Sequence, residues 1–170
     1  MRWQIFLNLF VGLALAFGPH SALSASPTEN PNFLEREIEG AHVGQAVNMI
    51  QSVIEGEGYT FMGVQNIDDG LNAKGFEQTP YKIVFLGDRE AFEEARAKDP
   101  RVTPYLPLKI TIYEGKEGNT HLSAVDPRIV GAMFNPGLQH QFLEWSQAIR
   151  RILEVTSEKV RAGTWPGTEG

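Results

Sequence analysis

The chain has 170 residues, of which 42% are hydrophobic and 21% are charged. These are ordinary values for a globular protein, and the length predicts one domain that buries a sizeable core. The formal net charge of −6 at pH 7 argues against electrostatic binding to nucleic acid or to an anionic membrane surface. The sequence contains no cysteine, which excludes disulfides, thiolate nucleophiles, cysteine-ligated metals and lipid attachment through a thiol.

The N-terminal segment has the pattern of a signal peptide. Arg2 precedes an apolar run over residues 5–17, Gly18-Pro19 ends that run, and residues 22–25 offer two small-residue cleavage sites. The run is shorter than the ~20 residues that a membrane-spanning helix needs. We therefore predict a signal peptide over residues 1–25 and a periplasmic or secreted mature protein with no stable membrane span. An uncleaved N-terminal anchor is the alternative.

The first half of the mature chain predicts a strand, a helix and a second strand. A polar linker over residues 26–32 precedes a strand over residues 33–38. Apolar residues at helical spacing predict a helix over residues 41–55. The strand predicted over residues 59–67 carries apolar residues on both faces, which is typical of an inner strand.

Two adjacent carboxylates, Asp68 and Asp69, follow this strand. A metal site is one interpretation. We favour the other, in which they form the N-terminal cap of a short helical turn over residues 71–75, where negative charge is stabilised.

The second half predicts, in order, a central strand over residues 81–86, a helix over 89–97, a β-hairpin over 108–125, a short helix over 128–134 and a long helix within 137–161. Asp88 and Asp126 precede two of these helices and are predicted N-caps. Leu143 and Leu153 broaden the apolar stripe of the long helix. A flexible, glycine-rich tail is predicted over residues 163–170.

The register of the hairpin follows from its two faces. Residues 108, 110, 112, 122 and 124 are apolar and alternate with mostly polar residues. A slip by one residue would expose the whole apolar set. A three-residue loop over residues 116–118 keeps the faces together, pairs Tyr113 with His121, and puts Gly118 at the left-handed position of the turn. A five-residue loop preserves the same faces and remains open.

The polar face of the hairpin then brings together Lys109, Tyr113, His121 and Ser123. It contains a nucleophile, a base and a cation, so one hypothesis is a hydrolase-type centre that uses Ser123, His121 and Lys109. Neighbours two apart on one strand rarely orient each other for nucleophilic attack. The same cluster fits a small binding site, a solvated sheet face or part of a dimer interface. Sequence motifs for metal, phosphate or dinucleotide binding are absent, and no cofactor is predicted.

A stretch of the chain resembles a known family. Residues 58–134 are similar to the domain of unknown function 302 family in Ile67-Asp68, Ala73-Lys74-Gly75, the strand 83–87, Leu106-Pro107-Leu108-Lys109, Tyr113-Glu114 and Asp126-Pro127. The resemblance implies an α+β fold, a dimer and no established activity. It carries Lys109 and Asp126 over as structural or binding positions. The chain departs from the family pattern at Asp69, where the family has histidine, at Ala124, where it has tyrosine, and at Gly87-Asp88-Arg89, where it has Gly-Asn-Pro.

Together these patterns predict a two-layer α+β domain over residues 33–162. Its antiparallel or mixed sheet would be covered on one face by two long helices. The function that the sequence favours is a non-enzymatic module of the cell envelope that binds a small ligand or a protein partner. Its candidate binding residues are Lys109, Tyr113, His121, Ser123 and Asp126. The alternatives are the hydrolase and a structural homodimer.

Overall fold

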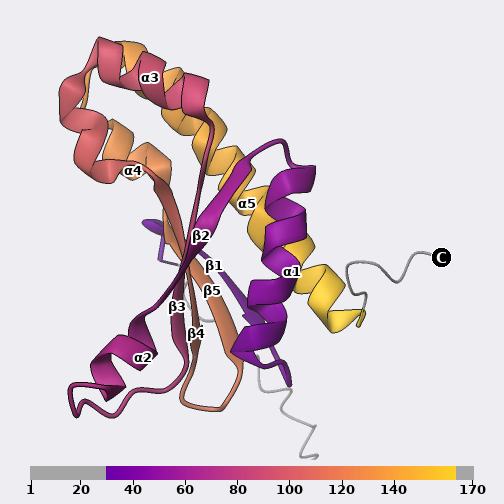
Figure 1. The fold of residues 1–170 in the computed structure, drawn as a ribbon. Coiled ribbons are helices and arrows are strands. Elements are labelled where there is room, and N and C mark those ends of the chain that lie inside the picture. Colours follow the sequence, from indigo (N-terminus) through magenta and orange to yellow (C-terminus); the bar gives the residue numbers. More distant parts are fainter. Residues whose placement is uncertain (1–29, 164–170) are drawn as a thin grey trace, which may run out of the picture.

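The computed structural model describes residues 30–163 (Figure 1). The predicted signal peptide, residues 26–29 of the predicted linker and residues 164–170 of the predicted tail lie outside the described residues. The strands are β1 (Phe33–Ile38), β2 (Thr60–Asn66), β3 (Tyr81–Gly87), β4 (Leu108–Glu114) and β5 (Thr120–Val125). They form one sheet in the order β1-β5-β4-β3-β2, and every neighbouring pair is antiparallel.

Helices cover one face of this sheet and extend beyond its ends. They are α1 (Val43–Gly56), α2 (Ile67–Asn72), α3 (Arg89–Lys98), α4 (Pro127–Gly131) and α5 (Gln139–Arg161), with two 3₁₀ segments at Pro100–Tyr105 and Pro136–Leu138. In Figure 1, α1 and α5 lie side by side on one face of the sheet, α3 and α4 lie beyond one end of it, and α2 lies at the other end. The predicted two-layer α+β fold is confirmed.

Apolar spacing explains why α1 and α5 pack on the sheet. The buried residues of α1 include Ala46, Ile50 and Val53, which lie three or four positions apart on one side of the helix. In α5, Trp145 and Ile149 are completely or almost completely buried. The predicted stripe of α5 is correct except at Leu143, which is 41% exposed. Leu143 lines a pocket between α5 and α4 instead.

The hairpin has the predicted three-residue loop. Tyr113 pairs with His121, and the inner apolar pair is Ile112 with Leu122. The Gly115 backbone N–H donates to Asn119 O at 2.8 Å, which closes the loop. Gly118 has φ of +79°, a conformation that costs a residue with a Cβ about 1–2 kcal/mol.

The prediction that β2 is an inner strand is wrong, because β2 lies at the edge of the sheet. The pairing between β2 and β3 shifts between Phe61 and Gly63. Such a bulge breaks the two-residue alternation, so the apolar residues of β2 do not all face the helices. Met62, at the irregularity, is 48% exposed. The apolar residues on both faces of β2 thus reflect the bulge. They do not indicate that the strand is buried on both sides.

Candidate functional site

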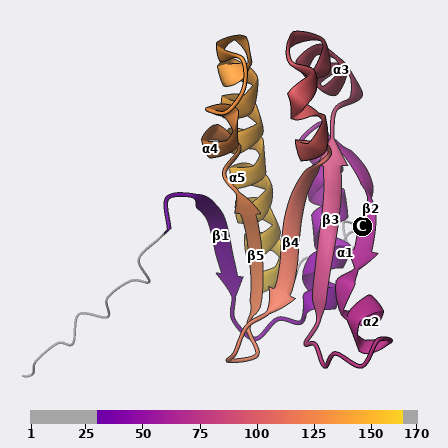
Figure 2. The same cartoon turned by 90° about the vertical axis from the view of Figure 1, so that its left-hand side faces the viewer.

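One face of the sheet has no helix on it in the part of the chain that the structure describes. Figure 2 looks onto this face and shows α1 and α5 behind the strands. We call it the open face. Strand pairing arranges its side chains in three rows across β1, β5, β4, β3 and β2: Phe33, Val125, Lys109, Phe85 and Gly63; then Glu35, Ser123, Thr111, Ile83 and Gln65; then Glu37, His121, Tyr113 and Tyr81. Four of the five candidate binding residues therefore lie on one surface.

β3 gives the open face its apolar character. Its residues Val84 and Leu86 are fully buried beneath the helices. Tyr81, Ile83 and Phe85 point to the opposite side and are only half-buried. The predicted central strand is indeed an inner strand with two apolar faces, yet only one of those faces is covered by helices.

The ring of His121 is held by two neighbours on the open face. It stacks on Tyr113 with ring centroids 5.1 Å apart and planes inclined by 13°. A Cβ at Gly115 would lie 2.4 Å from His121 Nε2, so the ring lies directly over the backbone at the start of the turn. His121 Nε2 is also 3.9 Å from Glu37 Oε1 across the β1–β5 pair. These contacts fix the ring flat on the sheet.

The serine of the predicted cluster has a different partner from the one a hydrolase requires. Ser123 Oγ donates a hydrogen bond to Glu35 Oε1 at 3.2 Å, across the strand pair. His121 lies two residues away on the same strand and stacks on Tyr113 instead. A nucleophilic serine needs its base within hydrogen-bond distance. Ser123 and His121 therefore do not form the Ser–His pair that the hydrolase hypothesis requires.

Asp126 is not part of the open face. It is fully buried and begins α4, where its carboxylate accepts hydrogen bonds from the Arg128 backbone N at 3.0 Å and from Arg128 Nη2 at 2.6 Å. Burial opposes its ionisation, but hydrogen bonds from Arg128 and Ser146 outweigh that effect and hold the pKa of Asp126 below its ordinary value. The charge of this candidate residue is satisfied inside the domain.

The turn at Asp126 has a counterpart earlier in the chain. Both Asp99-Pro100-Arg101 and Asp126-Pro127-Arg128 begin a short helix, and in each the aspartate binds the arginine two residues later. Asp99 also accepts a hydrogen bond from the Asn135 backbone N at 3.0 Å. The repeated tripeptide is visible in the sequence and indicates a structural clamp.

The adjacent carboxylates Asp68 and Asp69 lie in the first turn of α2, which begins earlier than predicted. Asp68 is buried and receives a hydrogen bond from Lys82 Nζ at 2.8 Å, while Asp69 is 3.8 Å from the same nitrogen. Neither is the N-cap residue, which is Asn66. The favourable negative charge at this helix start is as predicted. Within residues 30–163, no group of three or more histidine, cysteine, aspartate or glutamate side chains could hold a metal ion.

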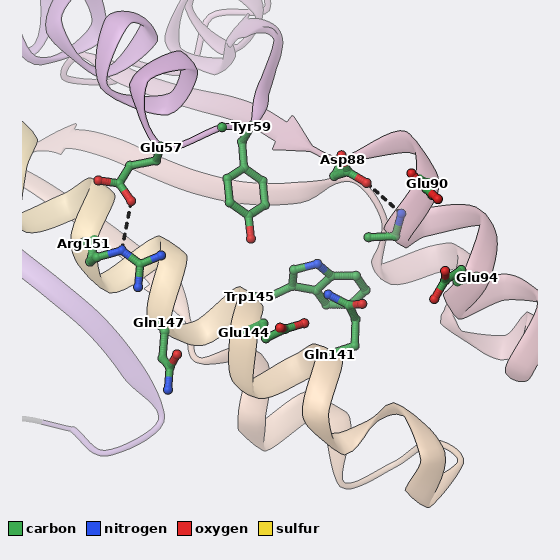
Figure 3. Close-up of a pocket in the computed structure, with 12 residues that line it drawn as sticks. Glu57, Tyr59, Asp88, Glu90, Glu94, Gln141, Glu144, Trp145, Gln147 and Arg151 are labelled. Carbon is green, nitrogen blue, oxygen red and sulfur yellow. Dashed lines mark hydrogen bonds and ion pairs between the residues drawn. The ribbon is translucent and has the colours of Figure 1, made fainter.

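A second surface, which the sequence did not reveal, is a cleft of about 540 Å³ on the helical side. We call it the acidic cleft (Figure 3). It lies where the α1–β2 and β3–α3 junctions meet α5. Its polar and aromatic lining residues are Glu57, Tyr59, Asp88, Glu90, Glu94, Gln141, Glu144, Trp145, Gln147 and Arg151. Five of these are carboxylates and one is a guanidinium, so the cleft carries an excess of negative charge.

Two of the five carboxylates support the walls of the acidic cleft. Glu57 Oε2 accepts a hydrogen bond from Arg151 Nε at 2.9 Å, which joins the end of α1 to α5. Asp88 Oδ1 accepts one from the Ala91 backbone N at 2.7 Å and is the predicted N-cap of α3. Burial raises the pKa of Tyr59, which extends into the cleft, above its ordinary value. Its hydroxyl therefore stays protonated at neutral pH.

Trp145 forms the inner wall of the acidic cleft. Its side chain is completely buried, with edge-to-face contacts to Phe92 at 5.9 Å and to Phe142 at 4.9 Å. Its indole N–H has no hydrogen-bond acceptor among the described residues. Figure 3 shows this nitrogen on the edge of the ring that points toward Tyr59 and Asp88. An unsatisfied buried donor costs about 1–3 kcal/mol, so its position beside the cleft needs an explanation.

Comparison with known proteins identifies the family. The model of a family described as "Domain of unknown function DUF302" matches residues 35–156. The chain belongs to the DUF302 family. A solved DUF302 protein, the uncharacterized conserved protein from Bacillus stearothermophilus, has a TM-score of 0.67 and 17% sequence identity over 74% of this chain and 98% of that chain. At this identity the likeness shows the fold alone. No curated protein matches the chain.

The DUF302 match extends well beyond residues 58–134, on which the resemblance was based. Two departures from the family pattern now have positions in the structure. Asp69 is exposed in the first turn of α2, and Ala124 is buried on the side of β5 that faces the helices. Both lie away from the open face and from the acidic cleft. Within residues 30–163, no helix is both long enough and apolar enough to span a membrane.

Proposed function

We propose that this DUF302 protein is a non-enzymatic binding module of the cell envelope that associates with a second copy of itself through the open face. The observation that carries the proposal is the outer side of β3. Tyr81, Ile83 and Phe85 follow one another along β3 and form an apolar stripe on a sheet face that no described helix covers. Sheets that are apolar on one face usually bury it against another layer.

The charges on the open face favour a second copy as the partner. Lys109 lies on the same surface as Glu35 and Glu37, so the face carries both signs. A two-fold interface buries the same patch on both subunits, and that patch must be complementary to itself. A face that carried only acidic groups would repel its own copy. The mixed charges around the apolar stripe of β3 avoid that repulsion.

The location in the envelope is supported by the sequence pattern of the N-terminal segment. An apolar run over residues 5–17 follows Arg2 and ends at Gly18-Pro19. The lack of cysteine means that the domain depends on packing and ion pairs for its stability outside the cytoplasm. The two Asp-Pro-Arg clamps, whose aspartates are buried, and the large apolar core are suited to that requirement.

Sedimentation equilibrium of the purified mature chain tests the proposed association. We expect a concentration-dependent dimer, and Tyr113→Arg should shift it to a monomer because the variant puts a charge inside the interface. Leu143→Arg is the matched control, since Leu143 is an exposed apolar residue on α5, away from the open face. A wild-type chain that stays monomeric at high concentration would contradict the proposal, as would a Tyr113→Arg dimer as stable as wild type.

A further inference from the structure

The acidic cleft has more carboxylates than its walls require. Glu57 and Asp88 hold its walls, but the other three lie on exposed helical positions: Glu90, Glu94 and Glu144. Two of them have only exposed contacts on their own helices, with Lys98 Nζ at 3.8 Å from Glu94 and with His140 Nδ1 at 3.6 Å from Glu144. The one guanidinium of the lining is already bound to Glu57. The cleft is therefore a place of negative potential, which attracts cations.

A cluster of acidic residues alone does not make a binding site, and Trp145 supplies an independent observation. Its indole N–H can only donate, it is completely buried, and no described residue accepts from it. The nitrogen points toward the space between Tyr59 and Asp88 (Figure 3). Buried donors normally have a partner, so this one indicates that an acceptor enters from the cleft.

We propose that the acidic cleft binds a small organic amine that also carries an oxygen acceptor, of the size and class of an amino sugar. Its ammonium group would lie among the exposed carboxylates of α3 and α5. One of its oxygens would accept from Trp145, and another would reach the protonated hydroxyl of Tyr59. The cleft volume of about 540 Å³ lies within the range of small-molecule sites.

A flexible side chain has to move for the oxygen to reach the indole. Trp145 is covered in the structure, and Gln141 lies one helical turn before it and lines the same cleft. The Gln141 side chain has no hydrogen bond to break among the described residues, so its rotation is the movement that would admit the ligand oxygen. A bare metal ion is a poorer fit than an amine, because no three acidic or histidine side chains within residues 30–163 converge on one point.

The test uses the mature chain and D-glucosamine, with D-glucose as the uncharged match, in calorimetric titrations at low salt. We expect glucosamine to bind, glucose to bind at least tenfold more weakly, and the affinity for glucosamine to fall as salt is raised. The indole N–H resonance of Trp145, assigned with a Trp165→Phe variant, should move on titration with glucosamine. Equal affinities for the two sugars would overturn the proposal, and so would an indole resonance that stays unchanged at saturation.

Charge-removing variants locate the site. Glu94→Gln combined with Glu144→Gln should weaken glucosamine binding by about tenfold or more, because charge-assisted contacts are lost. Glu158→Gln removes the same kind of charge from an exposed position of α5 outside the cleft and should leave the affinity unchanged. Equal losses in the two variants would overturn the site, because they would report only net charge. Binding of Mg²⁺ or Ca²⁺ in the absence of glucosamine binding would overturn the amine class.

Discussion

The open face and the acidic cleft differ in whether their polar groups have partners. On the open face the charges find partners within the sheet, as Ser123 does with Glu35, and the rings of Tyr113 and His121 stack flat. In the cleft, carboxylates outnumber cations, and a buried donor on Trp145 has no acceptor among the described residues. A flat surface with internally matched groups suits another protein surface. A hollow with unmatched groups suits a small ligand that brings the missing charge and acceptor.

The largest effect on stability is expected from truncating Trp145 in the acidic cleft, compared with truncating Tyr113 on the open face. Trp145→Ala should lower the free energy of unfolding by about 3–5 kcal/mol, because it leaves a cavity beneath α5. Tyr113→Ala should cost only about 1 kcal/mol, since its ring is half-buried and makes one stacking contact, with His121. Urea unfolding at micromolar protein concentration measures both. Equal losses would show that Tyr113 contributes as much to the core of the monomer as Trp145 does, which would contradict its assignment to an exposed interface.

The stability of an Asp126 variant tests whether this candidate binding residue has a structural role instead. Asp126→Asn should cost about 1–3 kcal/mol, because it removes the charge of a buried carboxylate that accepts hydrogen bonds from the half-exposed Arg128 side chain. Since the folded pKa of Asp126 lies below its ordinary value, its stabilisation is present above about pH 4 and is lost as the pH falls through the folded pKa. Unfolding free energies at pH 7 and pH 3 should therefore differ less in the variant than in wild type. A variant with the wild-type pH dependence would contradict this role.

The turn that sets the open face should show a smaller effect. Gly118→Ala should cost about 1 kcal/mol, because its φ of +79° is unfavourable for a residue with a Cβ. Gly44→Ala is the control, because Gly44 lies in α1 with ordinary helical backbone and open space where the added methyl group would lie. That substitution should raise stability by up to about 1 kcal/mol. Thermal unfolding of both variants measures the contrast, and a neutral Gly118→Ala would contradict the loop assignment.

The smallest effect is expected at the edge of the open face. Glu37 is 3.9 Å from His121 Nε2, and its side chain is 45% exposed. Glu37→Gln should change the free energy of unfolding by less than about 1 kcal/mol, because the Glu37 side chain is exposed and its oxygen can still accept from Asn119 Nδ2, which lies 2.7 Å from Glu37 Oε1. The same variant in sedimentation experiments should leave the dimer largely intact. A strong loss of stability or of dimer formation would show that this edge contributes more than the apolar stripe of β3.

The sequence predicted the open face well because the hairpin is local. Alternation of apolar residues and the need for Gly118 at a left-handed position determine which side chains share a surface. The sequence wrongly indicated an inner position for β2, because a bulge puts apolar residues on both of its faces as burial on both sides would. The repeated Asp-Pro-Arg tripeptide was a readable sign that Asp126 has an internal partner.

The acidic cleft could not be predicted in the same way. Its residues come from segments that are distant in the chain, such as Glu57, Asp88 and Glu144. Each acidic residue alone looks like part of a solvated helical face. Trp145 looks like an ordinary core residue, and only three-dimensional packing shows that its N–H lacks an acceptor among the described residues. Tertiary contacts, and not periodicity, create this surface.

Hydroxyl-radical footprinting of the mature chain tests the different roles of the two surfaces in one measurement. As protein concentration rises, Tyr81 and Tyr113 on the open face should become protected while Tyr59 in the cleft does not. Addition of glucosamine should then protect Tyr59 and leave the other two unchanged. If all three tyrosines respond together to either treatment, or if none responds, the assignment of a protein partner to the open face and a small amine to the acidic cleft is contradicted.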